Sequence, residues 1–161
     1  MYPLLATYTK ANGFAGSPTL DGIAHLEEAY PEDLAAIRWL RANVEGAPVV
    51  LEATGGSYTY YGRISVHTGL PTLLGWGGHE LQWRGNYEEP GKREPDIEAL
   101  YTSPDQGVTS SLLDKYDISY VYVGGLERRT YGITQPVLNK FDSLMDVVYQ
   151  QGDVVIYQRK E

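Results

Sequence analysis

The sequence contains no cysteine, and this absence excludes several kinds of chemistry at once. The chain can form no disulfide, bind no zinc through cysteine and use no thiol as a nucleophile. It also has only two Phe against fourteen Tyr, so most of its aromatic surface carries a hydroxyl group. Tyrosine is favoured where one end of the ring stays wet, as at interfaces and in ligand grooves. A set of Tyr-rich strands is the alternative explanation of this excess.

Long hydrophobic runs and an excess of basic charge are also absent. No stretch approaches the ~18 consecutive apolar residues of a membrane-spanning helix, and no signal peptide is visible. Thirteen basic and twenty-one acidic residues give a net charge of −8. A nucleic-acid-binding protein needs a basic surface, so we expect no nucleic-acid partner. At 161 residues the chain fits one domain, since domains cluster around ~100–150 residues.

Hydrophobic periodicity and chain breakers indicate an α/β fold. Residues 1–30 show weak periodicity and several breakers, so we expect an irregular lead-in there, followed by a single α/β domain over residues 31–161. Strand and helix patterns alternate in that domain and end in a hairpin, which favours a three-layer sandwich with a mixed sheet and a C-terminal β-hairpin. The predicted elements are helices near 31–44, 60–68, 96–101, 103–116 and 136–144, strands at 49–53, 72–74 and 119–124, a surface loop over 86–95, and a hairpin of 145–150 with 153–159.

The segment from Glu52 to Gly85 holds the residues best suited to chemistry. It contains two of the three Trp, two of the three His and many glycines. Glycines free the backbone to turn and let a ligand approach closely. Trp, His, Glu and Arg supply flat apolar faces, a titratable base, a carboxylate and a fork of donors. Segments that only build a core do not concentrate both kinds of residue, so we expect function here.

Three common kinds of site do not fit this segment. The turn at residues 55–57 lacks the glycine and lysine spacing of a phosphate-binding loop, and Ser57 lacks the Gly-x-Ser-x-Gly surroundings of a serine nucleophile. His67, His79 and the nearby glutamates show no recurring metal-ligand spacing. On a strand, the adjacent His79 and Glu80 would point in opposite directions and could not share one ion. We therefore expect no metal and no cofactor.

Carbohydrate binding fits the cluster between residues 75 and 85 better. Trp faces can cover the apolar face of a sugar, and carboxylate, amide and guanidinium groups can satisfy its hydroxyls. The alternative is a glycine-rich loop held by two Trp anchors, with Arg63 or Arg84 paired to Glu52 or Glu80. A third alternative is a small hydrolase that uses His and Glu. The candidate binding residues are Arg63, Trp76, His79, Glu80, Trp83 and Arg84, with Glu52, Tyr58, His67, Glu127 and Arg128 in support.

Several motifs of this sequence can be compared with known families. They are Glu52-Ala-Thr-Gly-Gly-Ser-Tyr58, Tyr60-Tyr-Gly-Arg-Ile-Ser65, Thr68-Gly-Leu-Pro-Thr72, Gly75-Trp-Gly-Gly-His-Glu-Leu-Gln-Trp-Arg-Gly85 and Tyr120-Val-Tyr-Val-Gly-Gly-Leu-Glu-Arg128. Together with Leu20-Asp-Gly22 and Val154-Val-Ile-Tyr157, they resemble the C-terminal region of the YYY membrane proteins over nearly the whole chain. These are large polytopic proteins of bacteria and archaea. The family in turn resembles integral-membrane glycosyltransferases that use polyprenyl-phosphate-linked sugars.

The resemblance implies a soluble C-terminal domain of a polytopic membrane protein, placed on the extracytoplasmic side. Its partners would be the transmembrane part of its own chain and a glycan or polyprenyl-phosphate sugar. The catalytic carboxylate of such transferases lies in an early extracytoplasmic loop outside this chain, so the domain would assist substrate binding without being catalytic alone. In this interpretation the 75–85 loop is mobile in isolation and faces the membrane-embedded active site, while Arg63 binds an anionic group or braces Glu52. A purely structural cap of the membrane part is the alternative.

Overall fold

A computed structural model of the chain describes residues 2–15 and 21–160. Its centre is a four-stranded sheet in the order β1-β2-β4-β3, formed by β1 (Val49–Leu51), β2 (Ile118–Val123), β3 (Met145–Gln151) and β4 (Val154–Arg159). β1 runs parallel to β2, whereas β4 is antiparallel to both β2 and β3. The predicted mixed sheet and C-terminal hairpin are therefore confirmed.

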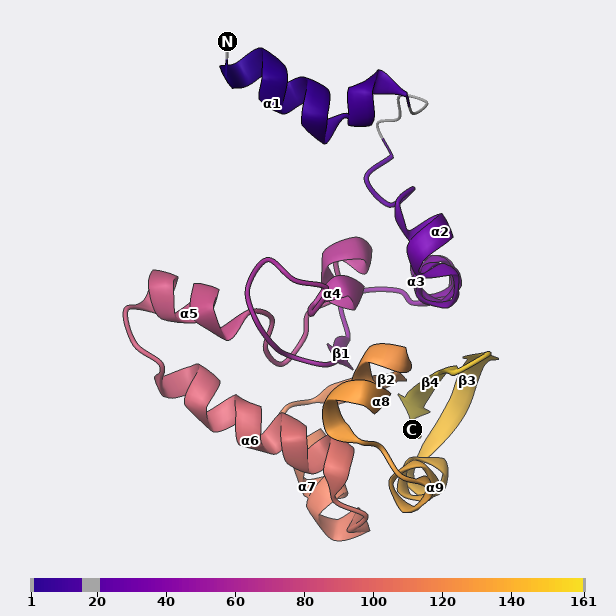
Figure 1. Ribbon diagram of the computed structural model, residues 1–161. Coiled ribbons are helices and arrows are strands. Elements are labelled where there is room, and N and C mark those ends of the chain that lie inside the picture. Colours follow the sequence, from indigo (N-terminus) through magenta and orange to yellow (C-terminus); the bar gives the residue numbers. More distant parts are fainter. Residues whose placement is uncertain (1, 16–20, 161) are drawn as a thin grey trace.

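Helices cover both faces of the sheet (Figure 1). They are α1 (Tyr2–Lys10), α2 (Leu26–Ala29), α3 (Pro31–Asn43), α4 (Arg63–Thr68), α5 (Gly77–Arg84), α6 (Glu88–Thr102), α7 (Gln106–Lys115), α8 (Gly125–Tyr131) and α9 (Gln135–Leu144), with a 3-10 turn η1 (Asn12–Phe14). Tyr120 and Tyr122 of β2 join an apolar cluster with α2, α3 and α4. Val121 and Val123 join a second cluster with α6, α7 and α9. Because successive side chains of a strand point to opposite faces, β2 lies at the middle of three layers.

The predicted helices over 31–44 and 103–116 are confirmed, with ends close to those expected. In α3, Pro31 occupies the first turn, and Ile37 and Leu40 are buried on one side of the helix. In α7, the side chain of Asp105 accepts a hydrogen bond of 2.9 Å from the backbone N–H of Val108. This cap satisfies one of the free donors at the start of the helix.

Two segments that the sequence predicts as loops are helical. The loop predicted over 86–95 is wrong, because α6 begins at Glu88 and continues through Pro95. The glycine-rich 75–85 segment is also not a loop, because α5 takes up most of it. The strand predicted at 72–74 is reduced to one isolated bridge, between Val50 and Thr72.

The predicted lead-in is not irregular throughout. It contains α1, η1 and α2, and residues 16–20 lie outside the described part. Leu26 of α2 is fully buried in the cluster that α3 builds on the sheet, whereas α1 stands away from the sheet (Figure 1). Within residues 2–15 and 21–160, no helix is both long and apolar enough to cross a membrane. A domain boundary at residue 30 stays a prediction.

Candidate functional site

The parallel pairing of β1 and β2 brings their carboxyl ends side by side. Tyr101 of α6 links these ends, because its hydroxyl lies 3.2 Å from the carbonyl oxygen of Leu51 and 2.8 Å from that of Tyr122. The chain leaves β1 into the loop of residues 52–62 and leaves β2 into α8. Ligands of α/β sheets commonly bind beyond the carboxyl ends of strands. The side chains held at these ends are therefore the first candidates for function.

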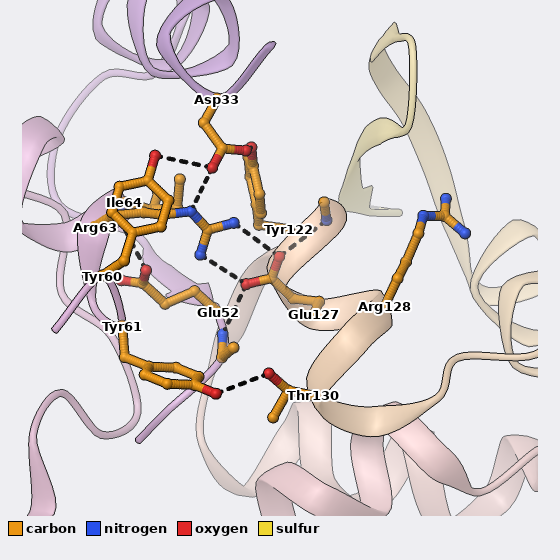
Figure 2. A network of polar contacts seen from close by, with 12 residues as sticks. Asp33, Glu52, Tyr60, Tyr61, Arg63, Ile64, Tyr122, Glu127, Arg128 and Thr130 are labelled. Atoms are coloured by element: carbon orange, nitrogen blue, oxygen red, sulfur yellow. Dashed lines mark hydrogen bonds and ion pairs between the residues drawn. The ribbon is translucent and has the colours of Figure 1, made fainter. Parts of the chain in front are cut away.

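Arg63 lies at the centre of a buried network beyond these strand ends (Figure 2). Its Nη1 and Nη2 donate hydrogen bonds to the two carboxylate oxygens of Glu127 at 3.0 and 2.8 Å. Its Nε donates to Asp33 at 2.7 Å. Asp33 also accepts hydrogen bonds from the hydroxyls of Tyr60, at 3.0 Å, and Tyr122, at 2.6 Å. One guanidinium group thus connects α3, α4 and α8 with β2.

Glu127 also holds the backbone at both strand ends. Its carboxylate accepts hydrogen bonds from the backbone N–H groups of Ala53, just after β1, and of Gly124, just after β2, each at 3.0 Å. Glu127 is fully buried. The sequence predicts Glu127 as a supporting site residue, and in the structure its carboxylate fixes the geometry of the strand ends.

Arg63 is paired with two carboxylates of the fold, so it braces the structure and is not free to bind an anion. Burial alone would lower the pKa of Arg63, but the carboxylates of Glu127 and Asp33 raise it well above the usual value. The residue is 2% exposed. The predicted brace between Arg63 and Glu52 is wrong, because Asp33 and Glu127 are the carboxylates that Arg63 contacts.

Glu52 serves the backbone of α4. Its two carboxylate oxygens accept hydrogen bonds from the backbone N–H groups of Ile64, at 2.9 Å, and Ser65, at 2.8 Å. Desolvation by burial raises the pKa of Glu52 to about 7, although these two N–H groups act in the opposite direction. Glu52 is fully buried, so it caps the first turn of α4 from beneath the surface.

An aromatic hollow opens beside the network, between α4 and the start of α5. The rings of Trp76 and His79 stand nearly perpendicular with centroids 5.0 Å apart, and Tyr58 packs against both, at 5.4 Å from Trp76 and 4.7 Å from His79. The indole Nε1 of Trp76 donates to the carbonyl oxygen of Tyr61 at 2.7 Å, which fixes the plane of the ring. The hollow has a volume of about 250 Å³ and is lined by Gly62, Ser65, Val66, Gly75, Trp76, His79 and Glu80.

His79 carries a polar atom that the fold does not use. Its Nε2 is buried, and no hydrogen-bond partner faces it in the described part of the chain. Buried polar groups nearly always have a partner, so this nitrogen indicates a ligand or water. The neighbouring Glu80 lines the same hollow. The expectation that His79 and Glu80 point in opposite directions is wrong, because this segment is a helix and not a strand.

Trp83 and Arg84 lie outside the aromatic hollow. Trp83 is 82% exposed, so it is neither a buried anchor nor a wall shared with Trp76. Arg84 forms an ion pair with Glu80, one turn earlier in α5. Of the six predicted binding residues, the structure groups three around the hollow, namely Trp76, His79 and Glu80.

The remaining supporting residues are scattered. Tyr58 packs against the rings of Trp76 and His79, whereas His67 lies at the end of α4, with its ring centroid 6.1 Å from that of His25. Partial burial lowers the pKa of His67, and the nearby basic groups act in the same direction. Arg128 points away from the Arg63 network in Figure 2, and its Nε donates to the carbonyl oxygen of Asp153 at 3.1 Å.

Sequence reasoning missed Asp33, Tyr60 and Tyr122 as members of the buried network. The one sequence feature that points to this network is the excess of Tyr over Phe. The hydroxyls of Tyr60 and Tyr122 donate hydrogen bonds to the carboxylate of Asp33, which Phe could not do. Among the residues that the structure describes, no three His, Asp or Glu side chains are grouped so that they could hold a metal ion.

No protein-family model matches the chain, and no curated protein matches its sequence. Among solved structures, the fold is similar to that of the C-terminal globular domain of an oligosaccharyltransferase from Archaeoglobus fulgidus, with a TM-score of 0.51 and 12% sequence identity. The similarity covers 78% of this chain and 95% of that domain. At this level of identity it concerns the fold, and the chain therefore has an α/β architecture found in a soluble domain of a glycosylation enzyme.

Proposed function

We propose that this chain is an extracytoplasmic domain of a polytopic membrane protein related to the YYY family, and that its aromatic hollow holds an uncharged sugar ring of a glycan or lipid-linked substrate. One observation carries the proposal: Trp76 and His79, whose rings are packed by Tyr58, line a hollow, and His79 Nε2 has no partner within the described residues. The domain positions this ring and is not catalytic alone.

The groups around the hollow match the two kinds of surface on a sugar. Flat aromatic rings can cover its apolar C–H face. The hydroxyls need donors and acceptors, which the carboxylate of Glu80, the hydroxyl of Ser65 and the free nitrogen of His79 supply. Trp76 is held in place by its bond to the backbone of Tyr61, so this face of the site is preformed.

The phosphate of a lipid-linked sugar suits this hollow less well than the sugar ring. The two arginines among the predicted binding residues are already paired, Arg63 with Asp33 and Glu127 and Arg84 with Glu80. The carboxylate of Glu80 lies at the hollow itself and would repel a second anion. We therefore do not retain the expectation that Arg63 binds an anionic group.

Two similarities support this placement in a glycosylation system. The five motifs quoted above resemble YYY membrane proteins, and the fold resembles a domain of an archaeal oligosaccharyltransferase. The first is a similarity of sequence, and the second is a similarity of backbone shape. Both support an extracytoplasmic domain that works beside its own membrane part.

Capping of that membrane part is a second candidate function. It is favoured by the exposed apolar side chains of Leu81, at 44%, and Trp83, at 82%, on α5. A surface of this kind suits packing against further protein, since large exposed apolar groups commonly mark contact sites. In the hydrolase alternative Glu52 is unsuited as the catalytic carboxylate, because it is fully buried and both of its oxygens accept backbone hydrogen bonds.

A titration of the ¹⁵N-labelled chain with simple mono- and disaccharides tests sugar binding directly, with the indole N–H of Trp76 as the reporter. We expect its signal to shift with saccharide and not with inorganic phosphate. Tyr58→Ala and His79→Ala should weaken binding by about tenfold. Trp83→Ala is the matched control, because it removes an aromatic ring from the same helix outside the hollow, and it should bind like the wild type.

If the separate domain binds saccharides weakly, the same variants in the intact membrane protein test whether the hollow has a role in substrate binding. Glycan products would be compared in cells that lack the native copy, after membrane insertion of each variant is confirmed. The proposal predicts altered products for the Tyr58→Ala/His79→Ala double variant and normal products for Trp83→Ala. Normal products from the double variant would refute a substrate role. Loss of products with Trp83→Ala alone would favour the capping function.

A further inference from the structure

The helix α1 presents an exposed apolar face. Leu4 is 78% exposed, Leu5 65% and Tyr8 55%. Phe14, in the turn η1 that follows, is 65% exposed and packs edge-on against Tyr8 with ring centroids 6.0 Å apart. Figure 1 shows α1 standing away from the sheet and its covering helices. These side chains therefore form an apolar ridge, made of Leu4, Leu5, Tyr8 and Phe14, which the body of the domain does not bury.

Charge is almost missing from this part of the chain. Lys10 is the only charged residue among the first twenty, although the whole sequence holds thirteen basic and twenty-one acidic residues. If this ridge faced water, we would expect it to contain some of these charged residues. Lys10 lies in the last turn of α1, where its long stem can run along apolar surface while the ammonium group stays among polar groups.

Both threonine hydroxyls of α1 are satisfied within the helix. The hydroxyl of Thr7 donates to the carbonyl oxygen of Pro3, and that of Thr9 to the carbonyl oxygen of Leu5, each at 2.8 Å. A hydroxyl that donates to the preceding turn in this way does not need a hydrogen bond to water. The helix can therefore enter an apolar surrounding without leaving these groups unpaired.

We infer that α1 docks into the interface of a lipid bilayer, with the apolar ridge at the boundary of the acyl chains and Lys10 among the headgroups. Amphipathic helices with Tyr, Phe and Leu on one face bind membranes in this way, and tyrosine is enriched at the level of the headgroups. The inference does not rest on sugar binding.

Flotation of the chain with phosphatidylcholine vesicles, with and without added phosphatidylglycerol, tests this docking. We expect the wild type to float with both kinds of vesicle. Leu4→Ser/Leu5→Ser should reduce the bound fraction at least about tenfold. Val108→Ser/Val147→Ser is the matched control, because it removes two exposed apolar side chains, at 44% and 47%, from α7 and β3. It should float like the wild type.

If the ridge bound something other than a bilayer, these experiments would give different results. A wild type that fails to float would overturn the inference, as would an equal loss in the two double variants. Light scattering in lipid-free buffer tests a second copy of the chain: a dimer that Leu4→Ser/Leu5→Ser abolishes, without flotation of the wild type, would show that the ridge binds protein. Circular dichroism confirms that each variant is folded. Saccharide titration of Leu4→Ser/Leu5→Ser should match the wild type, which separates this test from that of the hollow.

Discussion

Arg63 is the residue on which the geometry of the strand ends depends most, because it neutralises two buried carboxylates at once. We predict that Arg63→Met lowers the free energy of unfolding by about 3–5 kcal/mol, since Asp33 and Glu127 would remain buried without a cation. Urea denaturation followed by fluorescence measures this loss. Arg84→Met is the control, because its ion pair with Glu80 is solvent-exposed, and it should leave the unfolding midpoint nearly unchanged. Equal losses in the two variants would contradict a bracing role.

Glu52 should make stability depend on pH in a defined window. Burial raises the pKa of Glu52 from 4.5 to about 7, so between these values the folded protein keeps a proton that the unfolded chain has released. The free energy of unfolding should therefore fall as the pH rises from about 4.5 to about 7. Glu52→Gln, which cannot ionise, should lose this slope and unfold more easily by a constant amount, because one acceptor oxygen is replaced by a donor.

The measurement is a series of urea unfolding curves between these pH values for both proteins. His67 acts in the opposite direction in the wild type and in the variant alike, because its lowered pKa makes the unfolded chain bind the proton more readily just below pH 6.5. The difference between the two proteins isolates Glu52. A difference that does not change with pH would show that Glu52 titrates alike in the folded and unfolded states.

Residue types at this site could be predicted from the sequence, but their partners could not. The sequence identifies Arg63 as a candidate binding residue and Glu127 as a supporting one, yet they are 64 positions apart, and Asp33 is 30 positions from Arg63. Pairs at such separations are set by the packing of whole elements. In contrast, Trp76 and His79 lie three positions apart and come together as soon as the segment is helical.

At the scale of elements, the bridge between Gly55 and Trp76 positions the aromatic hollow. A Cβ atom on Gly55 would lie 2.7 Å from Cγ of Tyr61 and closer still to two other ring carbons. We predict that Gly55→Ala lowers the free energy of unfolding by about 1–3 kcal/mol and shifts the indole N–H signal of Trp76, because Tyr61 accepts that hydrogen bond. Gly75→Ala is the matched control, since a Cβ there meets no atom within 4 Å. A silent Gly55→Ala variant would mean that the loop adapts.

Elements were predictable where the chain itself carries the stop and start signals. Pro31 and Asp105 lie at the starts of α3 and α7, close to the starts expected at 31 and 103, and β2 is a run of β-branched and aromatic residues. α5 and the first part of α6, over residues 88–95, were missed, because glycines and prolines such as Pro95 indicate breaks in isolation. In the fold, buried Ile97 and Leu100 and ion pairs such as that of Lys92 with Glu88 offset that cost.

At the scale of the whole molecule, the two faces of the sheet have different tasks. The face under α6, α7 and α9 is filled by an apolar cluster and supplies stability. The other face carries the Arg63 network, and the aromatic hollow lies beside that network. Because the network ties α3, α4 and α8 to the strand ends, it fixes α4, whose Ser65 and Val66 line the hollow. A site supported in this way can be preformed before a ligand arrives.

Truncation of the chain tests which part of residues 1–30 contributes to the stability of the domain. Leu26 is fully buried against α3, and the ring of Tyr30 stacks on that of Tyr60 at 3.9 Å. A chain that begins at Asp21 should therefore unfold like the full one. A chain that begins at Pro31 should lose about 2–5 kcal/mol, because the pocket of Leu26 would be left empty.

Leu26→Ala in the full chain should reproduce most of that loss, which separates the missing side chain from the missing backbone. Urea unfolding followed by the fluorescence of Trp39, whose ring lies 5.5 Å from that of Tyr149, reports on the body in every variant. If the chain from Pro31 were as stable as the full one, the domain would begin at residue 31 as the sequence predicts. If the chain from Asp21 were destabilised as well, α1 would pack on the body in solution, and its apolar ridge would then not be free to meet a bilayer.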